Sequence, residues 1–196
     1  MKNIEEIKQN LKTRLSEKRY IHSIGTMKMA KLLAEKYNID PKKAELVGLV
    51  HDVGKEIPND EKLQYAKKYN IPVDDVEKVS VGLLHAKIGA YIAKTEYGFT
   101  EEMQNAIKYH TVGNPDMDLL AKIVYIADKI EENRKFDDLE YTKNLAFDNI
   151  DKCMVYILNF SIKEKIEENK LIHINAVLTR NKLINDFNNE KDLKIT

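Results

Sequence analysis

Hydrophobic residues recur at helical spacing along nearly the whole chain, and no segment shows the strict alternation that is typical of strands. Only seven glycines and four prolines interrupt the 196 residues, without repeats or low-complexity tracts. The pattern predicts an all-α fold, a compact helical bundle. Because a chain of this length lies within the range of one domain, we expect a single domain over residues 1–196.

The clearest helix boundary is at Asp40 and Pro41, where a capping residue is followed by proline at the first helical position. This helix is predicted to end at the turn that begins with His51 and Asp52. On a straight helix two neighbouring side chains would diverge by about 100°. At a helix end, where Gly54 can release the backbone, both can turn toward the same point.

Other boundaries place further polar residues at helix ends. Thr100 is predicted to cap a helix that ends at His110, and a turn at residues 114–116 precedes a strongly apolar helix that ends at Asp128. We expect one long helix from about Tyr141 to Asn169. A last helix is expected to begin at Ala176, with Asn175 as its cap.

Composition narrows the class of partner. Lysine plus arginine and aspartate plus glutamate balance at 32 each and are interspersed, which argues against a broad surface for nucleic acid or membrane. No apolar stretch resembles a signal sequence or approaches 18 residues, so a cytoplasmic protein is expected. The single cysteine, Cys153, cannot form an intrachain disulfide and is interpreted as a packed thiol.

Four of the five histidines and two aspartates have the residue types and order of a buried metal cluster: His22, His51, Asp52, His85, His110 and Asp128. Imidazole and carboxylate hold borderline divalent metals such as iron, manganese or zinc. Each histidine taken alone is more often a satisfied core residue. Asp128, however, lies on a strongly apolar face, where a carboxylate needs a cation or several hydrogen bonds.

The order His, His-Asp, His, His, Asp resembles the HD superfamily of metal-dependent phosphohydrolases, from about residue 15 to about residue 136. Four local strings are similar to those of its YqeK family, whose members hydrolyse diadenosine tetraphosphate symmetrically: HDVGKE at 51–56, HAKIGA at 85–90, HTVGNPDM at 110–117 and ADKIEENR at 127–134. The resemblance implies an HD-type helical domain over residues 15–136, with C-terminal helices over about 141–190 packing on it.

Coordination chemistry suggests how the ligands are shared. Two imidazoles and two carboxylates, from His22, His51, Asp52 and Asp128, can hold one metal and leave positions for water and phosphate. Two further histidines, His85 and His110, either complete a second metal bridged by Asp52 or point at substrate phosphate, and the sequence does not decide between these arrangements. The resemblance implies iron, as one or two ions, and the same ligands would accept manganese or another divalent metal.

Cations near these ligands are candidates for holding phosphate. Arg19 lies one helical turn before His22, Lys55 follows the His-Asp pair, and Arg134 follows Asp128 by six residues. All three match family positions, although Glu132 stands where the family commonly has a proline. Without the resemblance each would be interpreted as an ordinary solvated residue.

Three further residues are assigned to substrate. Thr111 and Gly113 resemble the family's threonine-glycine turn, where a hydroxyl and backbone amides could donate to phosphate. The resemblance also places the segment from Leu171 to Ala176 near the bound nucleoside, so His173 is expected to border the base or ribose. A histidine in such a loop is otherwise more often structural or solvated.

The predicted reaction is attack of a metal-activated water on an inner phosphorus of a dinucleoside tetraphosphate, giving two nucleoside diphosphates (ADP), with Asp52 and Lys55 as catalytic residues. Cleavage in the middle and the adenosine preference follow from the resemblance alone. Three alternatives remain: another HD nucleotide phosphohydrolase or nucleotidase, a non-catalytic nucleotide-sensing module, and a helical scaffold with a vestigial site. A homodimer is possible, and nucleic acid and membrane partners are not expected.

Overall fold

In a computed structural model the chain is described over residues 2–134 and 138–193. Helices joined by short loops make up these residues, and no strand occurs among them, which confirms the all-α prediction. The elements are α1 Ile4–Arg14, α2 Glu17–Lys36, α3 Pro41–Val50, α4 Asn59–Lys68, α5 Asp75–Val79, the 3-10 turn η1 Val81–Leu83, α6 Leu84–Tyr97, α7 Glu101–Tyr109, α8 Leu119–Ile130, α9 Leu139–Asp148, α10 Ile150–Glu167 and α11 Ile174–Leu193.

Local capping explains where the first predicted helices begin. The Asp40 carboxylate accepts hydrogen bonds from the Lys42 and Lys43 amides, and Pro41 takes the first position of α3, as predicted. The Thr100 hydroxyl accepts from the Met103 amide at the start of α7. Both helices end directly before a candidate ligand, so the caps fix where those ligands stand.

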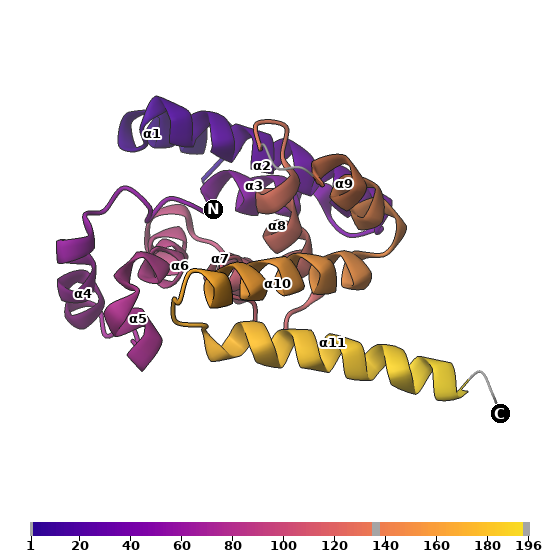
Figure 1. The fold of residues 1–196 in the computed structure, drawn as a ribbon. Helices are drawn as coiled ribbons and strands as arrows, with labels where there is room; N and C mark the ends of the chain where they lie inside the picture. The colour runs from indigo at the N-terminus through magenta and orange to yellow at the C-terminus, as the bar shows by residue number, and fades with distance from the viewer. Residues whose placement is uncertain (1, 135–137, 194–196) are drawn as a thin grey trace.

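The core forms where α2, α3, α6, α7 and α8 pack together. Fully buried aliphatic side chains fill the space between them, among them Leu33, Val50, Ile88, Ile107 and Ile123. The apolar helix α8 runs through the middle of the molecule and contacts α2, α3 and α7 on one side and α10 on another (Figure 1). Because α8 carries Asp128, this carboxylate is held at the centre of the fold.

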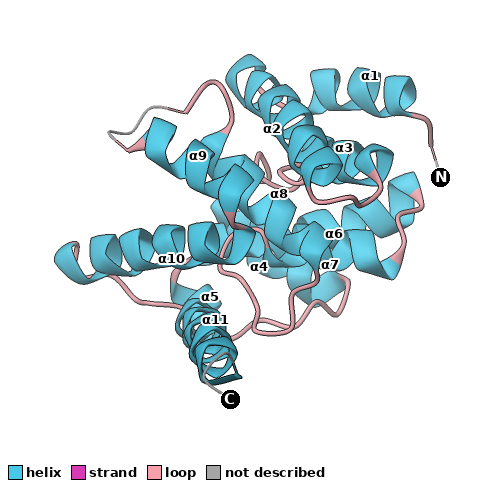
Figure 2. Ribbon diagram, turned by 90° about the vertical axis from the view of Figure 1, so that its right-hand side faces the viewer, coloured by secondary structure: helices cyan, strands magenta, loops and turns pink. Residues whose placement is uncertain are grey.

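The C-terminal helices form an outer layer. Helix α10 packs against α8, α9 and α11, and α11 lies beside α10 at the edge of the molecule, where it is seen end-on in Figure 2. Cys153 is fully buried in α10, as predicted for a packed thiol, and burial raises its pKa to about 12. None of the helices among the described residues is both long and apolar enough to cross a membrane.

Two predicted boundaries in this layer are wrong. The expected single helix over 141–169 is two helices, because the extended backbone of Asn149 ends α9 while its side chain accepts from the Lys152 amide and starts α10. The last helix begins at Ile174 rather than Ala176. His173, not Asn175, precedes it, and the His173 ring nitrogen Nδ1 accepts a hydrogen bond from the Asn175 amide.

Candidate metal centre and adjoining pocket

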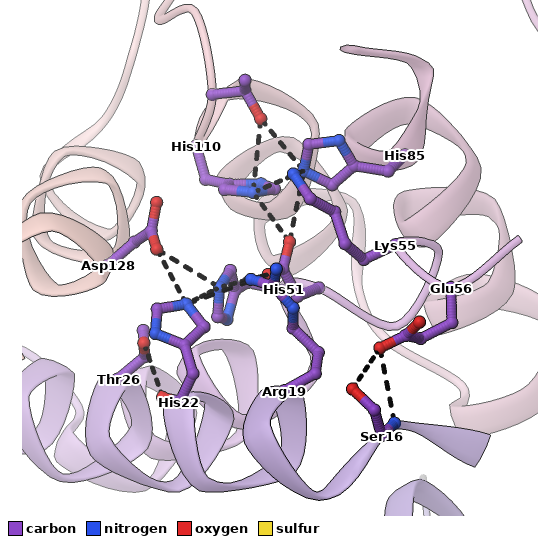
Figure 3. A network of polar contacts seen from close by, with 12 residues as sticks. Ser16, Arg19, His22, Thr26, His51, Lys55, Glu56, His85, His110 and Asp128 are labelled. Carbon is purple, nitrogen blue, oxygen red and sulfur yellow. Dashed lines mark hydrogen bonds and ion pairs between the residues drawn. The ribbon is translucent and has the colours of Figure 1, made fainter. Parts of the chain in front are cut away.

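The six candidate ligands meet at one buried point, although they come from five separate stretches. Figure 3 shows His22, His51, His85, His110 and Asp128 pointing toward one another. His22 lies on α2, His51 and Asp52 follow α3, and Asp128 lies in the last turn of α8. His85 lies in the first turn of α6 and His110 follows α7, so both reach the point from helix ends. All six are buried, with His22 the most exposed at 8%.

Gly54 allows the His51-Asp52 turn to approach α6. A β-carbon on this residue would lie 2.6 Å from the carbonyl oxygen of His85 and 3.0 Å from the Gly89 nitrogen. Any other residue would therefore push the turn away from α6. The glycine matters for this close approach, which brings Asp52 next to His85.

The Asp52 carboxylate divides the cluster into two sides. On one side its Oδ2 lies 3.8 Å from His22 Nε2 and 3.6 Å from His51 Nε2, and Asp128 Oδ1 lies 2.9 Å from His22 Nε2. On the other side its Oδ1 lies 3.2 Å from His85 Nε2 and 3.6 Å from His110 Nε2. One carboxylate thus faces two pairs of imidazoles.

Backbone carbonyls determine which imidazole nitrogens face inward. Nδ1 of His51 lies 2.7 Å from the Gly48 carbonyl oxygen, and Nδ1 of His85 and His110 lie 2.6 Å from those of Gly82 and Ile107. A carbonyl can only accept, so in each neutral ring Nδ1 carries the proton and Nε2 carries the lone pair. The Nε2 atoms are therefore free to act as ligands.

These inward-facing nitrogens approach each other closely. His22 Nε2 and His51 Nε2 are 3.2 Å apart, and His85 Nε2 and His110 Nε2 are 3.1 Å apart. Lone pairs that face each other beside carboxylate oxygens need a cation or a proton between them. The donor set of imidazoles and carboxylates fits a borderline divalent metal, which is also what the HD domain implies.

The charge states agree with metal binding. Burial lowers the pKa of His110 to about 4 and also lowers the pKa of His85, so both rings are neutral at pH 7. Burial would raise the pKa of Asp52, but its interactions with the neighbouring rings of His51, His110 and His85 hold the pKa well below its ordinary value. Neutral imidazoles and an ionised carboxylate are the forms that bind metal.

Several cations surround the centre. Arg19 Nη1 lies 2.6 Å from Asp52 Oδ2, and Arg134 Nη2 lies 2.5 Å from Asp128 Oδ1. Lys55 Nζ lies 3.4 Å from His85 Nε2, and burial lowers the pKa of its ammonium group. All three cations predicted from the sequence therefore lie at the centre.

A pocket of about 610 Å³ opens beside the centre. Thr111, Lys129 and Arg134 line it and also contact the ligands: the Thr111 hydroxyl lies 3.3 Å from His110 Nε2, and Lys129 pairs with Asp128 at 2.7 Å. Apolar side chains form much of the remaining wall: Leu83, Val112, Ile157, Leu158, Phe160, Ile162, Leu171, Ile172 and Ala176. This volume is typical of small-molecule sites.

Two predicted substrate residues have other partners. Gly113 has a φ of 77°, its amide donates to the Tyr109 carbonyl, and a β-carbon there would lie 3.0 Å from Thr179 on α11. That amide already has a backbone acceptor, and the contact of Gly113 with phosphate stays a prediction. His173 does line the pocket, but its Nε2 lies 2.8 Å from Asp74 Oδ2 and its Nδ1 accepts from a backbone amide, so neither ring nitrogen is available.

Asp74, Glu77 and His173 also lie close enough together to resemble a metal site. Lys87 Nζ lies 2.5 Å from Glu77 and 3.8 Å from Asp74, so a lysine ammonium group already neutralises this group. Asp74 also caps α5 by accepting from the Glu77 amide. The cluster is a structural connection between α5 and the start of α11.

The sequence analysis missed two residues at the centre, Lys129 and Glu131. Lys129 pairs with Asp128, and Glu131, 1% exposed, lies 3.1 Å from the Nδ1 of His22. A signal for Glu131 was present, because it follows Asp128 by three residues and so lies one helical turn further along the same face. Glu131 was overlooked because it stands in the charged run that follows Asp128.

Comparison with known proteins supports this description of the fold. The HD-domain family matches residues 19–133. The chain is 34% identical to the symmetrical bis(5'-nucleosyl)-tetraphosphatase of Bacillus subtilis over 93% of this chain and 98% of that protein. It is 35% identical to the Staphylococcus aureus enzyme of the same name, over 79% of this chain and 81% of the relative.

A crystal structure from Clostridium acetobutylicum, described as a predicted HD superfamily hydrolase involved in NAD metabolism, superposes with a TM-score of 0.92. The two sequences are 36% identical, and the match covers 95% of this chain and 99% of the other. The resemblance inferred from the motifs is therefore confirmed. This chain belongs to the HD-domain family and, within it, to the family of symmetrical bis(5'-nucleosyl)-tetraphosphatases.

Proposed function

We propose that this protein is a metal-dependent hydrolase that cleaves diadenosine tetraphosphate symmetrically into two molecules of ADP. The observation that carries the proposal is the two pairs of imidazoles around Asp52, beside a pocket whose lining residues Thr111, Lys129 and Arg134 contact the candidate ligands. The names of the relatives supply the substrate, which the geometry alone does not specify.

We propose two metal positions that share Asp52. His22, His51 and Asp128 would hold the first, and His85 and His110 would hold the second, since each pair of Nε2 atoms faces a different oxygen of Asp52. A divalent metal, when bound, acidifies water and withdraws charge from phosphoryl oxygens. We propose iron in the cell, with manganese or another divalent ion accepted by the same ligands.

The protein's cations would bind the polyphosphate. Arg19, Lys55 and Arg134 stand around the ligands, where they can offset negative charge that develops on the phosphoryl oxygens. Asp52 accepts hydrogen bonds and orients the attacking water. The leaving nucleoside diphosphate is a stabilised anion, so the reaction does not require a separate general acid.

The pocket would receive one nucleoside. Its apolar wall suits a base or ribose, and Lys129 and Arg134, which line it and pair with Asp128, suit the phosphate that follows. We propose that His173 contributes through the face of its ring and by holding the wall in place, because Asp74 and the Asn175 amide occupy its nitrogens. The Thr111 hydroxyl, which lies beside both His85 and His110, would donate to a phosphate oxygen.

Other parts of the proposal concern the whole chain. One cluster of buried apolar residues extends from Ile7 on α1 to Leu183 on α11, which supports a single domain. Residues 135 and 136, at the end of the predicted metal core, lie outside the described residues. We propose a cytoplasmic enzyme whose partner is a small nucleotide.

The deciding experiment is turnover of diadenosine tetraphosphate by protein reconstituted with ferrous iron or manganese, with products separated by chromatography. ADP as sole product is expected. AMP plus ATP, or turnover only of mononucleotides, would leave an HD phosphohydrolase and exclude symmetrical cleavage. Tight nucleotide binding without turnover would favour a sensing module, and binding that survives loss of His51 and Asp52 would favour a scaffold with a vestigial site.

A further inference from the structure

Glu131 is a buried carboxylate directly behind the metal centre. It follows the last residue of α8, is 1% exposed, and its Oε1 lies 3.1 Å from the Nδ1 of His22. Those two residues are 109 positions apart in the sequence. An ionised carboxylate is costly at such a depth unless its oxygens are bonded, so the contact with His22 stabilises a charge that packing alone would not tolerate.

The second oxygen of Glu131 is also held. Oε2 accepts hydrogen bonds from the Asn133 amide at 2.7 Å and from the Asn133 side chain at 2.9 Å. Gly25 makes room for it on α2, because a β-carbon on that residue would collide with Oε2. Oε2 is thus held by Asn133 and lies against Gly25, and only Oε1 is directed at the imidazole of His22.

His22 differs in this respect from the other three histidines of the centre. Backbone carbonyls anchor the Nδ1 atoms of His51, His85 and His110, whereas His22 has a charged partner. A carboxylate that accepts from Nδ1–H fixes the ring and its tautomer and makes the opposite nitrogen a stronger metal ligand. The Nε2 of His22 lies 2.9 Å from Asp128 and 3.2 Å from the Nε2 of His51, so it faces the centre.

We propose that Glu131 is the positioning residue of His22: it holds the imidazole with the proton on Nδ1 and strengthens Nε2 as a ligand of the first metal position. This inference rests on the metal centre of the proposed function. It predicts that Gly25 serves the same purpose, since its missing side chain lets the carboxylate reach the ring. If Glu131 only stabilised the turn at Asn133, metal affinity would not depend on it.

The test compares Glu131→Gln with Glu132→Gln, a matched control whose exposed carboxylate pairs with Lys28 on the surface. Glutamine keeps the shape but has one acceptor oxygen, so it cannot serve both His22 and Asn133. Cobalt(II) is titrated into metal-free protein against a competing chelator. We expect Glu131→Gln to weaken the tighter site by about 10- to 100-fold, the range for loss of an outer partner of a ligand, and Glu132→Gln to change it less than about twofold.

Nitrogen-15 NMR of the histidine rings gives a second readout in metal-free protein. In the unaltered chain the His22 ring is expected to carry its proton on Nδ1, and in Glu131→Gln to lose that preference as the glutamine amide turns toward it. Unchanged cobalt affinity together with an unchanged His22 tautomer would overturn the proposal. Circular dichroism establishes that each variant is folded before it is titrated.

Gly25→Ala keeps the proposal testable if Glu131→Gln does not fold, because it displaces the carboxylate without removing it. We expect weaker cobalt binding in this variant, and full affinity would contradict the inference. Failure of the proposed function is distinguishable: the unaltered chain would then bind cobalt no better than His51→Ala. Tight binding to the unaltered chain and equal binding to Glu131→Gln would reject only the role of Glu131.

Discussion

The HD core and the C-terminal helices differ in how fully their side chains are buried. In the core all six candidate ligands are buried, and a hydrogen bond fixes the outer nitrogen of each imidazole. Helix α11, which contributes to the pocket wall, buries Leu183 but leaves Ile174 60% and Leu178 45% exposed. Dense packing fixes the candidate metal ligands, whereas part of the pocket wall belongs to a lightly packed outer layer.

This difference indicates how the two parts would tolerate change. Ligand positions depend on the contacts of α2, α3, α6, α7 and α8 at once, so shifts there affect the centre as a whole. Helices α9 and α10 of the outer layer contact α8 of the core, and α9 also contacts α2. Such outer layers open more readily than a core. Alterations of the core should therefore affect metal binding, and alterations of the outer layer should affect substrate binding.

The largest effect is expected from Asp52→Ala, which removes the carboxylate that faces both pairs of imidazoles. Metal content should be lost while helicity is largely kept. Activity should fall by more than about 100-fold, because losing even a residue that only supports a ligand costs up to about 100-fold. Metal analysis, kinetics and circular dichroism measure this. Asp60→Ala, an exposed carboxylate on α4, is the control. Activity that survives in Asp52→Ala would disprove the metal mechanism.

Met154→Ala tests how far the outer layer depends on its own packing. Met154 is fully buried in α10, so the cavity left by truncation should cost about 2–5 kcal/mol of unfolding free energy. Chemical denaturation measures the loss, and Met154→Leu, which keeps the volume, should cost less than about 1.5 kcal/mol. Cobalt affinity of the folded variant should stay unchanged, and a loss there would show that the two regions are not separable.

Arg134→Ala addresses the boundary between the centre and the pocket. Loss of a charge-assisted contact to phosphate should cost about 1.5–3 kcal/mol, which is about 10- to 150-fold in kcat/KM, with metal content unchanged. The same loss is expected for Lys55→Ala. Steady-state kinetics with diadenosine tetraphosphate measures it, with Arg180→Ala as control, because the Arg180 side chain bonds to Asn159 on α10. Unaltered kinetics would make these two residues ordinary surface cations.

The smallest effect is expected from His173→Ala. If His173 acts by tying α11 to α5 through Asp74, its loss should raise KM by about 2- to 12-fold, the equivalent of one ordinary hydrogen bond of about 0.5–1.5 kcal/mol. Asp74→Ala should give a similar change, and the double variant little more. Additive effects would contradict this connection and favour direct contact of His173 with the nucleoside.

Local signals made much of the centre predictable. Caps and turns depend on neighbouring residues, so Asp40, Pro41 and Thr100 marked helix starts correctly from sequence alone. The break at Asn149 is also a local signal, but apolar spacing continued on both sides and favoured one helix. The six ligands were grouped because their order resembles that of the HD superfamily, and the cost of burying a carboxylate such as Asp128 on an apolar helix face without a cation agrees with that grouping.

By itself, the sequence determined the all-α class, the ends of the ligand-bearing helices, and which residue types meet at the centre. Only the tertiary structure decided that Asp52 faces two pairs of imidazoles, that Glu131 lies behind His22, and that Gly113 lies against Thr179. The reason is physical: a cap involves residues three positions apart, whereas these contacts join distant segments whose approach depends on how whole helices pack.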